Sequence, residues 1–343
     1  MNHKSYIKRC LELAKLGHGR VSPNPMVGAV IIVDNQIIGE GFHQKFGGPH
    51  AEVNAINSVA DKSLLQKATI YVSLEPCSHF GKTPPCADLI IKHQIPKVVI
   101  AAIDSNAKVC GNGIAKLKKA GIEVITGILE DESNRLNQTF NTFHQKKRPF
   151  ITLKWAESAD GFIDHIRNDR STPAQKISNS STSRWVHQLR SESDAILIGK
   201  HTALLDNPSL TTRKWDGSHP TRIIIDSNLE LPESLNLFHD QVDTLIFNRK
   251  KSGQKNHVSF IQIPDTLDTL DFILKHLWEI QIHSLLVEGG TYTLQQFINH
   301  ELFDSAYIIK SQHSLSHGVA APRIPRTYNN CKVLYNNEIL IYE

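Results

Sequence analysis

Four residues in a short stretch of the chain have the types and the spacing to build a metal-activated water. His50, Cys77 and Cys86 are three possible metal ligands, and Glu52 follows the histidine by two positions. Zinc in hydrolytic sites takes three protein ligands and leaves its fourth position to a water, whose pKa it lowers to about 7. We therefore predict that His50, Cys77 and Cys86 bind one zinc ion and that Glu52 transfers protons beside it.

The order of the motifs carries the specificity of this prediction. His-Ala-Glu alone is a common helix start, and two cysteines alone are often buried as small apolar residues. The series His-Ala-Glu, Glu-Pro-Cys and Pro-Pro-Cys is typical of zinc nucleobase deaminases, in which a non-ligand glutamate transfers protons. Their pattern usually ends in Cys-x-x-Cys, whereas eight residues separate Cys77 from Cys86 here. We predict that this longer, basic loop contacts the substrate through His79 and Lys82.

Length and composition limit the possible classes of protein. The chain has 343 residues, which favours two domains. Its net charge of +4 suits a small anionic substrate and does not require nucleic acid. No apolar run has the length of a membrane span, and the first residues lack the apolar core of a signal peptide. Five cysteines without a disulfide-like spacing indicate a reducing compartment, so we predict a cytoplasmic protein.

Hydrophobic periodicity predicts an α/β domain in the first part of the chain. The expected strands are 27–33, 37–41, 68–74, 97–103 and 122–126, and the expected helices are 6–16, 50–58, 87–93, 114–120 and 131–144. In this arrangement Cys77 follows the carboxyl end of a strand, where open α/β sheets bind their ligands.

A second α/β series follows a basic, proline-terminated stretch at 145–149, which we interpret as a linker, with a solvated helix end as the alternative. We place the domains at 1–145 and 146–343. The second domain's expected strands are 150–155, 194–198, 221–225, 243–247, 258–261, 284–288 and 305–309, and its helices are 180–191, 267–280 and 291–300.

The motifs of both halves resemble one known family, the bifunctional deaminase/reductase of riboflavin biosynthesis. The segments that carry the resemblance are 23–30, 39–43, 49–55 and 74–86 in the first half, and 158–161, 184–190, 206–213 and 287–291 in the second. The resemblance covers nearly the whole chain. It implies a cytidine-deaminase-like three-layer α/β/α domain followed by a dihydrofolate-reductase-like α/β domain, with Zn²⁺ and NADPH as cofactors.

For the first domain, the resemblance implies hydrolytic deamination of a diaminopyrimidinone ribosyl phosphate, with Glu52 transferring protons between the water, the ring nitrogen and the leaving amine. The substrate-binding candidates are Asn24, His43, His79, Lys82, Asp104 and Asn106. Asn24 could instead be a plain turn residue before a proline, and the others could be solvated loop residues. The family usually has a proline after the last of these residues, where this chain has Ala107.

For the second domain, the resemblance implies that NADPH reduces the ribosyl group to ribityl. No Gly-x-Gly-x-x-Gly motif follows a strand, so a double glycine before a helix is the candidate phosphate site. The cofactor-binding candidates are Ala156, Lys176, Thr202, Asp206, Ser227, Gly289, Gly290 and Thr291. The substrate-binding candidates are Lys154, Arg190, Leu210, Arg213 and Glu288, with both arginines aimed at the phosphate. A tight turn at the glycines and a surface position for Arg190 are the plain alternatives.

One segment departs from the family pattern. Residues 174–178 stand where the family commonly has Ser-x-Trp-Ile, and Lys176 replaces the tryptophan. The lysine could pair with a cofactor phosphate, or the loop could dock differently.

Three other functions remain open from the sequence. The second domain could be degenerate or serve only for dimerisation. A nucleic-acid deaminase would need a basic stripe with stacking aromatic residues, but the basic residues here are dispersed. A structural zinc site would need a fourth protein ligand. We expect a small-molecule enzyme without nucleic-acid or membrane partners, forming a homodimer through its reductase domain. Preference for NADPH over NADH and transfer of the intermediate between the sites are left undecided.

Overall fold

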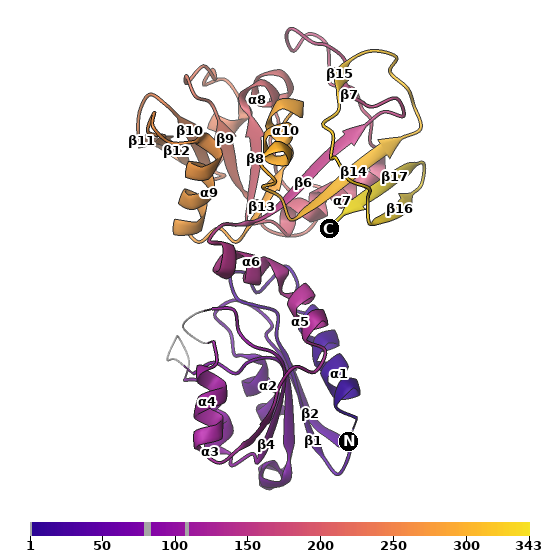
Figure 1. Ribbon diagram of the computed structural model, residues 1–343. Helices are drawn as coiled ribbons and strands as arrows, with labels where there is room; N and C mark the ends of the chain where they lie inside the picture. The colour runs from indigo at the N-terminus through magenta and orange to yellow at the C-terminus, as the bar shows by residue number, and fades with distance from the viewer. Residues whose placement is uncertain (1, 79–83, 107–109) are drawn as a thin grey trace. The chain divides into compact units, whose positions relative to one another are not determined.

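The chain forms two compact units, Met1–Lys147 and Arg148–Glu343 (Figure 1). The computed structural model describes residues 2–78, 84–106 and 110–343. None of the described helices is both long and apolar enough to cross a lipid bilayer.

A five-stranded sheet in the order β2-β1-β3-β4-β5 forms the centre of the first unit. Strand β1 is antiparallel to both of its neighbours, and β3, β4 and β5 run parallel. Every residue of β3 is buried, as expected for a strand covered on both faces. The strands are β1 (Gly28–Val33), β2 (Gln36–Phe42), β3 (Thr69–Leu74), β4 (Lys97–Ala102) and β5 (Glu123–Ile125).

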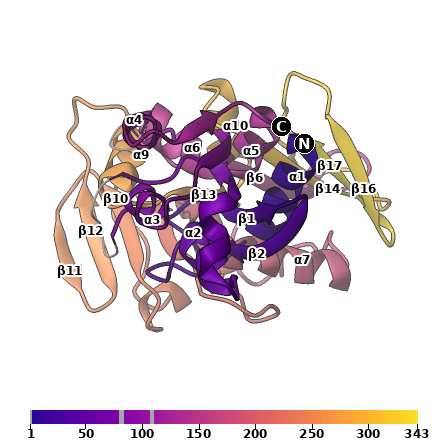
Figure 2. The ribbon, with the colours of Figure 1, turned by 90° about the horizontal axis from the view of Figure 1, so that it is seen from below.

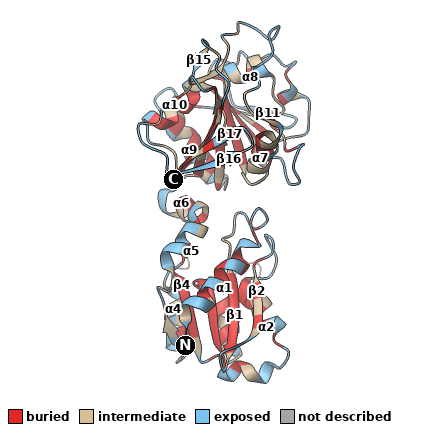
Figure 3. Ribbon diagram, turned by 90° about the vertical axis from the view of Figure 1, so that its right-hand side faces the viewer, coloured by how far each residue is buried: buried red, intermediate tan, exposed pale blue. Residues whose placement is uncertain are grey.

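Helices cover both faces of this sheet, so the unit has three layers. Alternating residues of a strand point to opposite faces: Ile31 packs toward α2 and α3, while Val30 packs toward α1. The helical elements are α1 (His3–Lys15), α2 (Ala51–Ser58), η1 (Lys62–Lys67), α3 (Cys86–Lys92), α4 (Asn112–Lys119), α5 (Glu130–Leu136) and α6 (Gln138–Lys146). Figure 3 shows the buried strands between more exposed helices.

Two predictions for the end of this unit are wrong. The helix expected at 131–144 is two helices, α5 and α6, which meet at Asn137. The Asn137 side chain hydrogen-bonds the backbone of Met26, so a long-range contact is made where the helix breaks. The expected linker at 145–149 begins two residues too early, because α6 continues to Lys146 and ends at Lys147 with φ of 52°.

The second unit is built on a ten-stranded sheet in the order β11-β12-β10-β9-β8-β13-β6-β14-β17-β16. Its central strands are parallel, and antiparallel pairs form both edges, which lie at opposite ends of the sheet in Figure 2. The strands are β6 (Phe150–Glu157), β8 (Ala195–Gly199), β9 (Thr221–Ile225), β10 (Thr244–Asn248), β11 (Gly253–Lys255), β12 (Val258–Gln262), β13 (Ser284–Val287), β14 (Ser305–Ser311), β16 (Asn330–Leu334) and β17 (Asn337–Tyr342). A separate small pair consists of β7 (Phe162–Asp164) and β15 (Val319–Ala320).

The two faces of the large sheet pack against different helices and form two separate hydrophobic cores. Leu197 of β8 belongs to the core with α9 and α10, while its neighbour Ile196 faces the opposite core with α8. The helical elements are α7 (Ser180–Ser191), α8 (Lys200–Asp206), η2 (Asn236–Phe238), α9 (Thr269–Glu279) and α10 (Thr291–Asn299). The predicted bounds of α7 and β9 are correct. Helix α8 and the strands β7, β11, β15 and β16, which are short or largely exposed, were not predicted, and neither was the longer, mostly buried β17.

Candidate functional site

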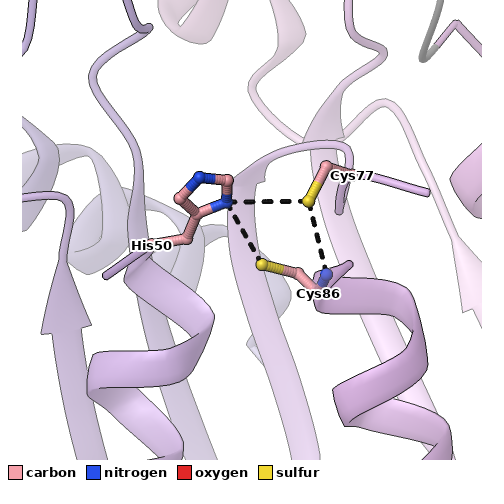
Figure 4. Close-up of side chains that lie close together, drawn as sticks. All are labelled: His50, Cys77 and Cys86. Atoms are coloured by element: carbon pink, nitrogen blue, oxygen red, sulfur yellow. Dashed lines mark hydrogen bonds between the residues drawn. The ribbon is translucent and has the colours of Figure 1, made fainter. Parts of the chain in front are cut away.

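The three predicted zinc ligands lie together at the ends of three different elements (Figure 4). His50 precedes the first residue of α2, Cys77 follows β3, and Cys86 is the first residue of α3. The Nδ1 atom of His50 lies 3.6 Å from the Sγ of Cys77 and 3.3 Å from the Sγ of Cys86. Residues far apart in the sequence thus present one nitrogen and two sulfurs to a common point.

This ligand set fits a zinc ion. Tetrahedral zinc with the usual Zn–N and Zn–S lengths separates a nitrogen from a sulfur ligand by about 3.6 Å, close to the observed distances. Hydrogen bonding between the two thiols and with His50 lowers the pKa of Cys77 to about 4, which favours the thiolate that binds metal. No fourth histidine, cysteine or carboxylate joins the group within the described ranges.

Glu52 lies in the first turn of α2, buried beside the ligands. Burial, with the neighbouring negative charge of Cys77, raises its pKa to about 7. A carboxyl group with a pKa near neutrality can both accept and release a proton, which is the property that general acid–base catalysis requires.

A cavity of about 260 Å³ opens beside the metal ligands. Its walls include four residues that the sequence analysis singled out for substrate binding: Asn24, His43, Asp104 and Asn106. The other two predicted substrate residues of this domain, His79 and Lys82, lie outside the described residues.

His43 links the substrate side of the cavity to the metal ligands. Its Nδ1 donates to the carbonyl of Pro49 at 3.0 Å, directly before His50. This leaves its Nε2 to accept from Nδ2 of Asn24 at 3.1 Å. Burial lowers the pKa of His43, so the neutral ring that this tautomer requires is favoured. The bond also orients the Asn24 side chain.

Glu75 holds the opposite wall together, a role the sequence analysis missed. Its buried carboxylate accepts hydrogen bonds from the backbone N–H groups of Asp104, Gly111, Gly113 and Ile114, at 2.9–3.3 Å. These bonds tie the segment after β4 and the start of α4 to the end of β3. The proximity of Glu75 to Cys77 in the sequence was the available signal, but it does not reveal these partners.

In the second unit, three predicted substrate residues form one buried ionic cluster. Arg190 of α7 donates from Nε and Nη2 to the Glu288 carboxylate at 3.1 and 2.7 Å. Lys154 of β6 lies 4.0 Å from the same carboxylate. Burial opposes ionisation of Glu288, but the two cations outweigh it and lower its pKa to about 2. Burial lowers the pKa of Lys154, and the charge of Glu288 partly opposes this shift.

The other two predicted substrate residues lie on the segment after α8. Leu210 is buried with φ of 53°. Thr211 joins the arginines, because its carbonyl accepts from Arg190 at 3.4 Å and its hydroxyl accepts from Arg213 at 3.4 Å. Arg213 is exposed. Glu288 accepts hydrogen bonds from two nitrogens of Arg190, and the expectation that Arg190 contacts the substrate phosphate stays a prediction.

The double glycine forms the turn between β13 and α10, as the sequence analysis expected. The N–H of Gly290 donates to Thr202 Oγ1 at 2.9 Å, which joins two predicted cofactor residues from different segments. A Cβ on Gly289 would lie 3.2 Å from the backbone nitrogen of Gly199 and 3.0 Å from the Cβ of Thr293, so close packing requires glycine here. Thr291 begins α10, whose N-terminus favours an anion.

The segment that departs from the family pattern is attached to Asp206. Arg167 forms ion pairs with Asp164 and with Asp206, and it donates to the Leu205 carbonyl at 3.2 Å. The backbone N–H of Gln175 also donates to Asp164. Lys176 beside it is exposed. Arg167 was missed because its two carboxylate partners could not be inferred from spacing.

The remaining two cofactor candidates lie in, or shortly after, strands of the large sheet. Ala156 is in β6, opposite Ile309 of β14. Ser227 lies in the turn after β9, and its carbonyl accepts from the Arg249 N–H at 2.9 Å.

Two known protein families match the two units. The cytidine and deoxycytidylate deaminase zinc-binding region matches residues 1–102. The RibD C-terminal domain matches residues 149–310. The riboflavin biosynthesis protein RibD of Aquifex aeolicus is 40% identical over 323 residues, which is 92% of this chain and 89% of that protein.

The chain belongs to the RibD family. The RibD of Bacillus amyloliquefaciens is 40% identical over 88% of this chain and 82% of its own length. A Thermotoga maritima structure, described as a diaminohydroxyphosphoribosylaminopyrimidine deaminase/5-amino-6-(5-phosphoribosylamino)uracil reductase, has a TM-score of 0.86 and 38% identity, and covers 99% of this chain and 97% of its own. RibD of Acinetobacter baumannii has a TM-score of 0.84 and 31% identity, with 99% and 98% covered.

RibD membership confirms the expected fold and general function. The chain has a cytidine-deaminase-like domain with a His/Cys/Cys cluster for zinc and a reductase domain of an NADPH-using family. It is an enzyme of riboflavin biosynthesis that combines a deamination with a reduction. A degenerate second domain is not favoured, because the reductase family match accompanies an intact cluster of Lys154, Arg190 and Glu288.

Proposed function

We propose that the first unit deaminates a diaminopyrimidinone ribosyl phosphate and that the second unit reduces the ribosyl group of the product to ribityl. The observation that carries this proposal is the cavity in which the His50, Cys77 and Cys86 cluster meets Glu52 and a set of polar side chains. The relative from Thermotoga maritima bears the names of these two activities.

In the deaminase, we assign His50, Cys77 and Cys86 as the zinc ligands and Glu52 as the catalytic acid–base. Zinc bound there supplies an activated water. Glu52 accepts one proton of this water and transfers it to the ring nitrogen as the oxygen bonds to the ring carbon. It then accepts the second proton from that oxygen and transfers it to the amine, which departs as ammonia and leaves a carbonyl on the ring. Its buried position and its pKa near 7 support both directions of transfer.

Substrate binding in the deaminase involves both walls of the cavity. Asn24, oriented by His43, binds the pyrimidine at one wall. Asp104 and Asn106 bind the substrate at the other, where Glu75 fixes the backbone. The segment outside the described residues adds His79 and Lys82, whose types suit a phosphate.

In the reductase, we assign the ionic cluster to the phosphorylated substrate. Glu288 orients Arg190, and Lys154 and Arg213 add the charge that attracts a phosphate. Leu210 supplies an apolar contact. NADPH supplies the hydride when bound. The proposed residues that hold it are Ala156, Lys176, Thr202, Asp206, Ser227, Gly289, Gly290 and Thr291.

Domain limits, oligomeric state and location belong to this proposal as well. We place the functional domains at 1–145 and 146–343, near the boundary between the compact units. A homodimer forms through the reductase domain, which exposes Val333 and Tyr335 at an edge hairpin. The five cysteines are free, which suits a cytoplasmic protein.

The decisive experiment follows both steps on the purified full-length chain. We expect one equivalent of zinc, ammonia release from the diaminopyrimidinone phosphate, and NADPH oxidation that depends on the deaminated product. Ammonia release without NADPH oxidation would restrict the chain to the first activity. The rate with NADH in place of NADPH, on the same deaminated substrate, tests the cofactor preference.

The molar mass of a Val333→Glu variant, measured by light scattering, tests the dimer.

A further inference from the structure

The last helix of the first unit contacts the deaminase cavity and both of the loops that line it. Asn137 lies directly before α6, and Phe140 and Asn141 follow at i+3 and i+4, so the three side chains share one helix face. Phe140 is buried and forms part of the cavity wall. Neither the zinc motifs nor the predicted substrate residues include this helix.

Asn137 holds the loop that carries Asn24. Its Oδ1 accepts from the Met26 N–H at 2.8 Å, and its Nδ2 donates to the Met26 carbonyl at 3.0 Å. The side chain is buried, with 3% of its surface exposed. A buried amide that satisfies both polar groups of one residue fixes the backbone there, two residues after Asn24.

Asn141 holds the opposite loop. Its Oδ1 accepts a hydrogen bond from the Ser105 hydroxyl at 2.9 Å. Ser105 stands between Asp104 and Asn106, which both line the cavity. One helix face therefore connects the two walls between which the substrate must fit.

We propose that Asn137 and Asn141 are positioning residues of the deaminase, which set the separation of the two substrate-binding loops, and that Phe140 between them forms the apolar wall against the pyrimidine. This inference rests on the proposed substrate cavity and assigns α6 to it. Loops held in their binding positions need not be ordered when the substrate binds, so these residues act on substrate affinity without touching the zinc ligands.

The experiment measures steady-state deamination, zinc content and reductase activity of the full-length chain. We expect Ser105→Ala and Asn141→Ala each to raise the KM for deamination about fivefold, the equivalent of one lost hydrogen bond, with kcat and zinc content unchanged. The double variant should raise KM no further than Asn141→Ala alone, because that substitution already removes the bond from Ser105. Asn137→Ala should lower kcat/KM about tenfold.

The matched control is Gln138→Ala, an exposed residue next to Asn137 on α6, which should leave all values at those of the wild type. Wild-type KM values in the Ser105 and Asn141 variants would overturn the inference, as would additive effects in the double variant. A general loss of folding would instead lower zinc content and kcat. If Asn137→Ala fails to fold, Ser105→Ala still tests the inference. A wild-type chain that releases no ammonia overturns the proposed function itself.

Discussion

Two buried glutamates, one in each unit, have pKa values shifted in opposite directions. Glu52 lies among the zinc ligands, where burial and the charge of Cys77 raise its pKa to about 7. Glu288 lies between Arg190 and Lys154, whose charges outweigh its burial and lower its pKa to about 2. Both carboxyl groups are shielded from solvent, yet Glu52 can exchange a proton near neutral pH and Glu288 stays ionised. The difference arises because the neighbouring charges have opposite signs.

The difference explains why the two sites suit different chemistry. Deamination requires protons to move between the water and the leaving amine, and Glu52 can exchange them near neutral pH. Glu288 keeps its charge at every physiological pH and accepts two hydrogen bonds from Arg190. A fixed ion pair of this kind suits the proposed binding of a phosphorylated substrate.

The largest effect is expected from Glu52→Gln. The amide has nearly the shape of the carboxyl but cannot transfer protons, so ammonia release should fall by about 10³-fold. Zinc content should remain unchanged, as should NADPH oxidation when the deaminated product is supplied as the substrate. Glu288→Gln is the matched control, and it should leave ammonia release unaltered. Substantial deamination by the Glu52 variant would remove this residue from the mechanism.

The second effect concerns the reductase cluster. Arg190→Met keeps an unbranched apolar stem but removes the guanidinium and its charge, and kcat/KM for the deaminated substrate should fall about 100-fold, as for the loss of one or two charged hydrogen bonds. Deamination by the same protein provides the internal reference. An unchanged kcat/KM would place the phosphate elsewhere.

A third prediction uses the acid stability of the second unit. The pKa of Glu288 is about 2 in the folded protein and ordinarily 4.5, so its ionic contribution to stability, about 3 kcal/mol, is complete above pH 4.5. The contribution is lost as the pH falls through about 2. Denaturant unfolding of wild type and Glu288→Gln should therefore differ most near neutrality and converge in acid, whereas a constant difference would contradict the assigned shift.

The smallest effect is expected at the glycine turn. Thr202→Val removes the acceptor for the Gly290 N–H at almost constant volume, and the KM for NADPH should rise about fivefold, as for one lost hydrogen bond. Thr202→Ser keeps the hydroxyl and should remain close to wild type. If the two variants had the same KM for NADPH, the hydroxyl of Thr202 would have no part in binding the cofactor.

The first unit was the easier one to predict from sequence. Its strands and helices are apolar and regular, and the zinc ligands stand at the ends of these elements within a short stretch. The break at Asn137 was not predictable, because a helical pattern continues across it and the reason for the break is a contact with Met26, more than a hundred residues earlier. The edge strand β16 was missed because it is largely exposed and has no strong alternation.

The sequence by itself determined the residue types of both sites and the family that carries them, since the zinc motifs and the double glycine are local patterns that can be recognised without knowing the fold. The tertiary structure decided which groups meet. Parallel pairing of β6 with β13 brings Lys154 to Glu288, and the four N–H groups around Glu75 come from segments that only folding joins. Charge and hydrogen bonding act through distance in space, so the pKa values of Glu52 and Glu288 follow from the fold and not from the residue type.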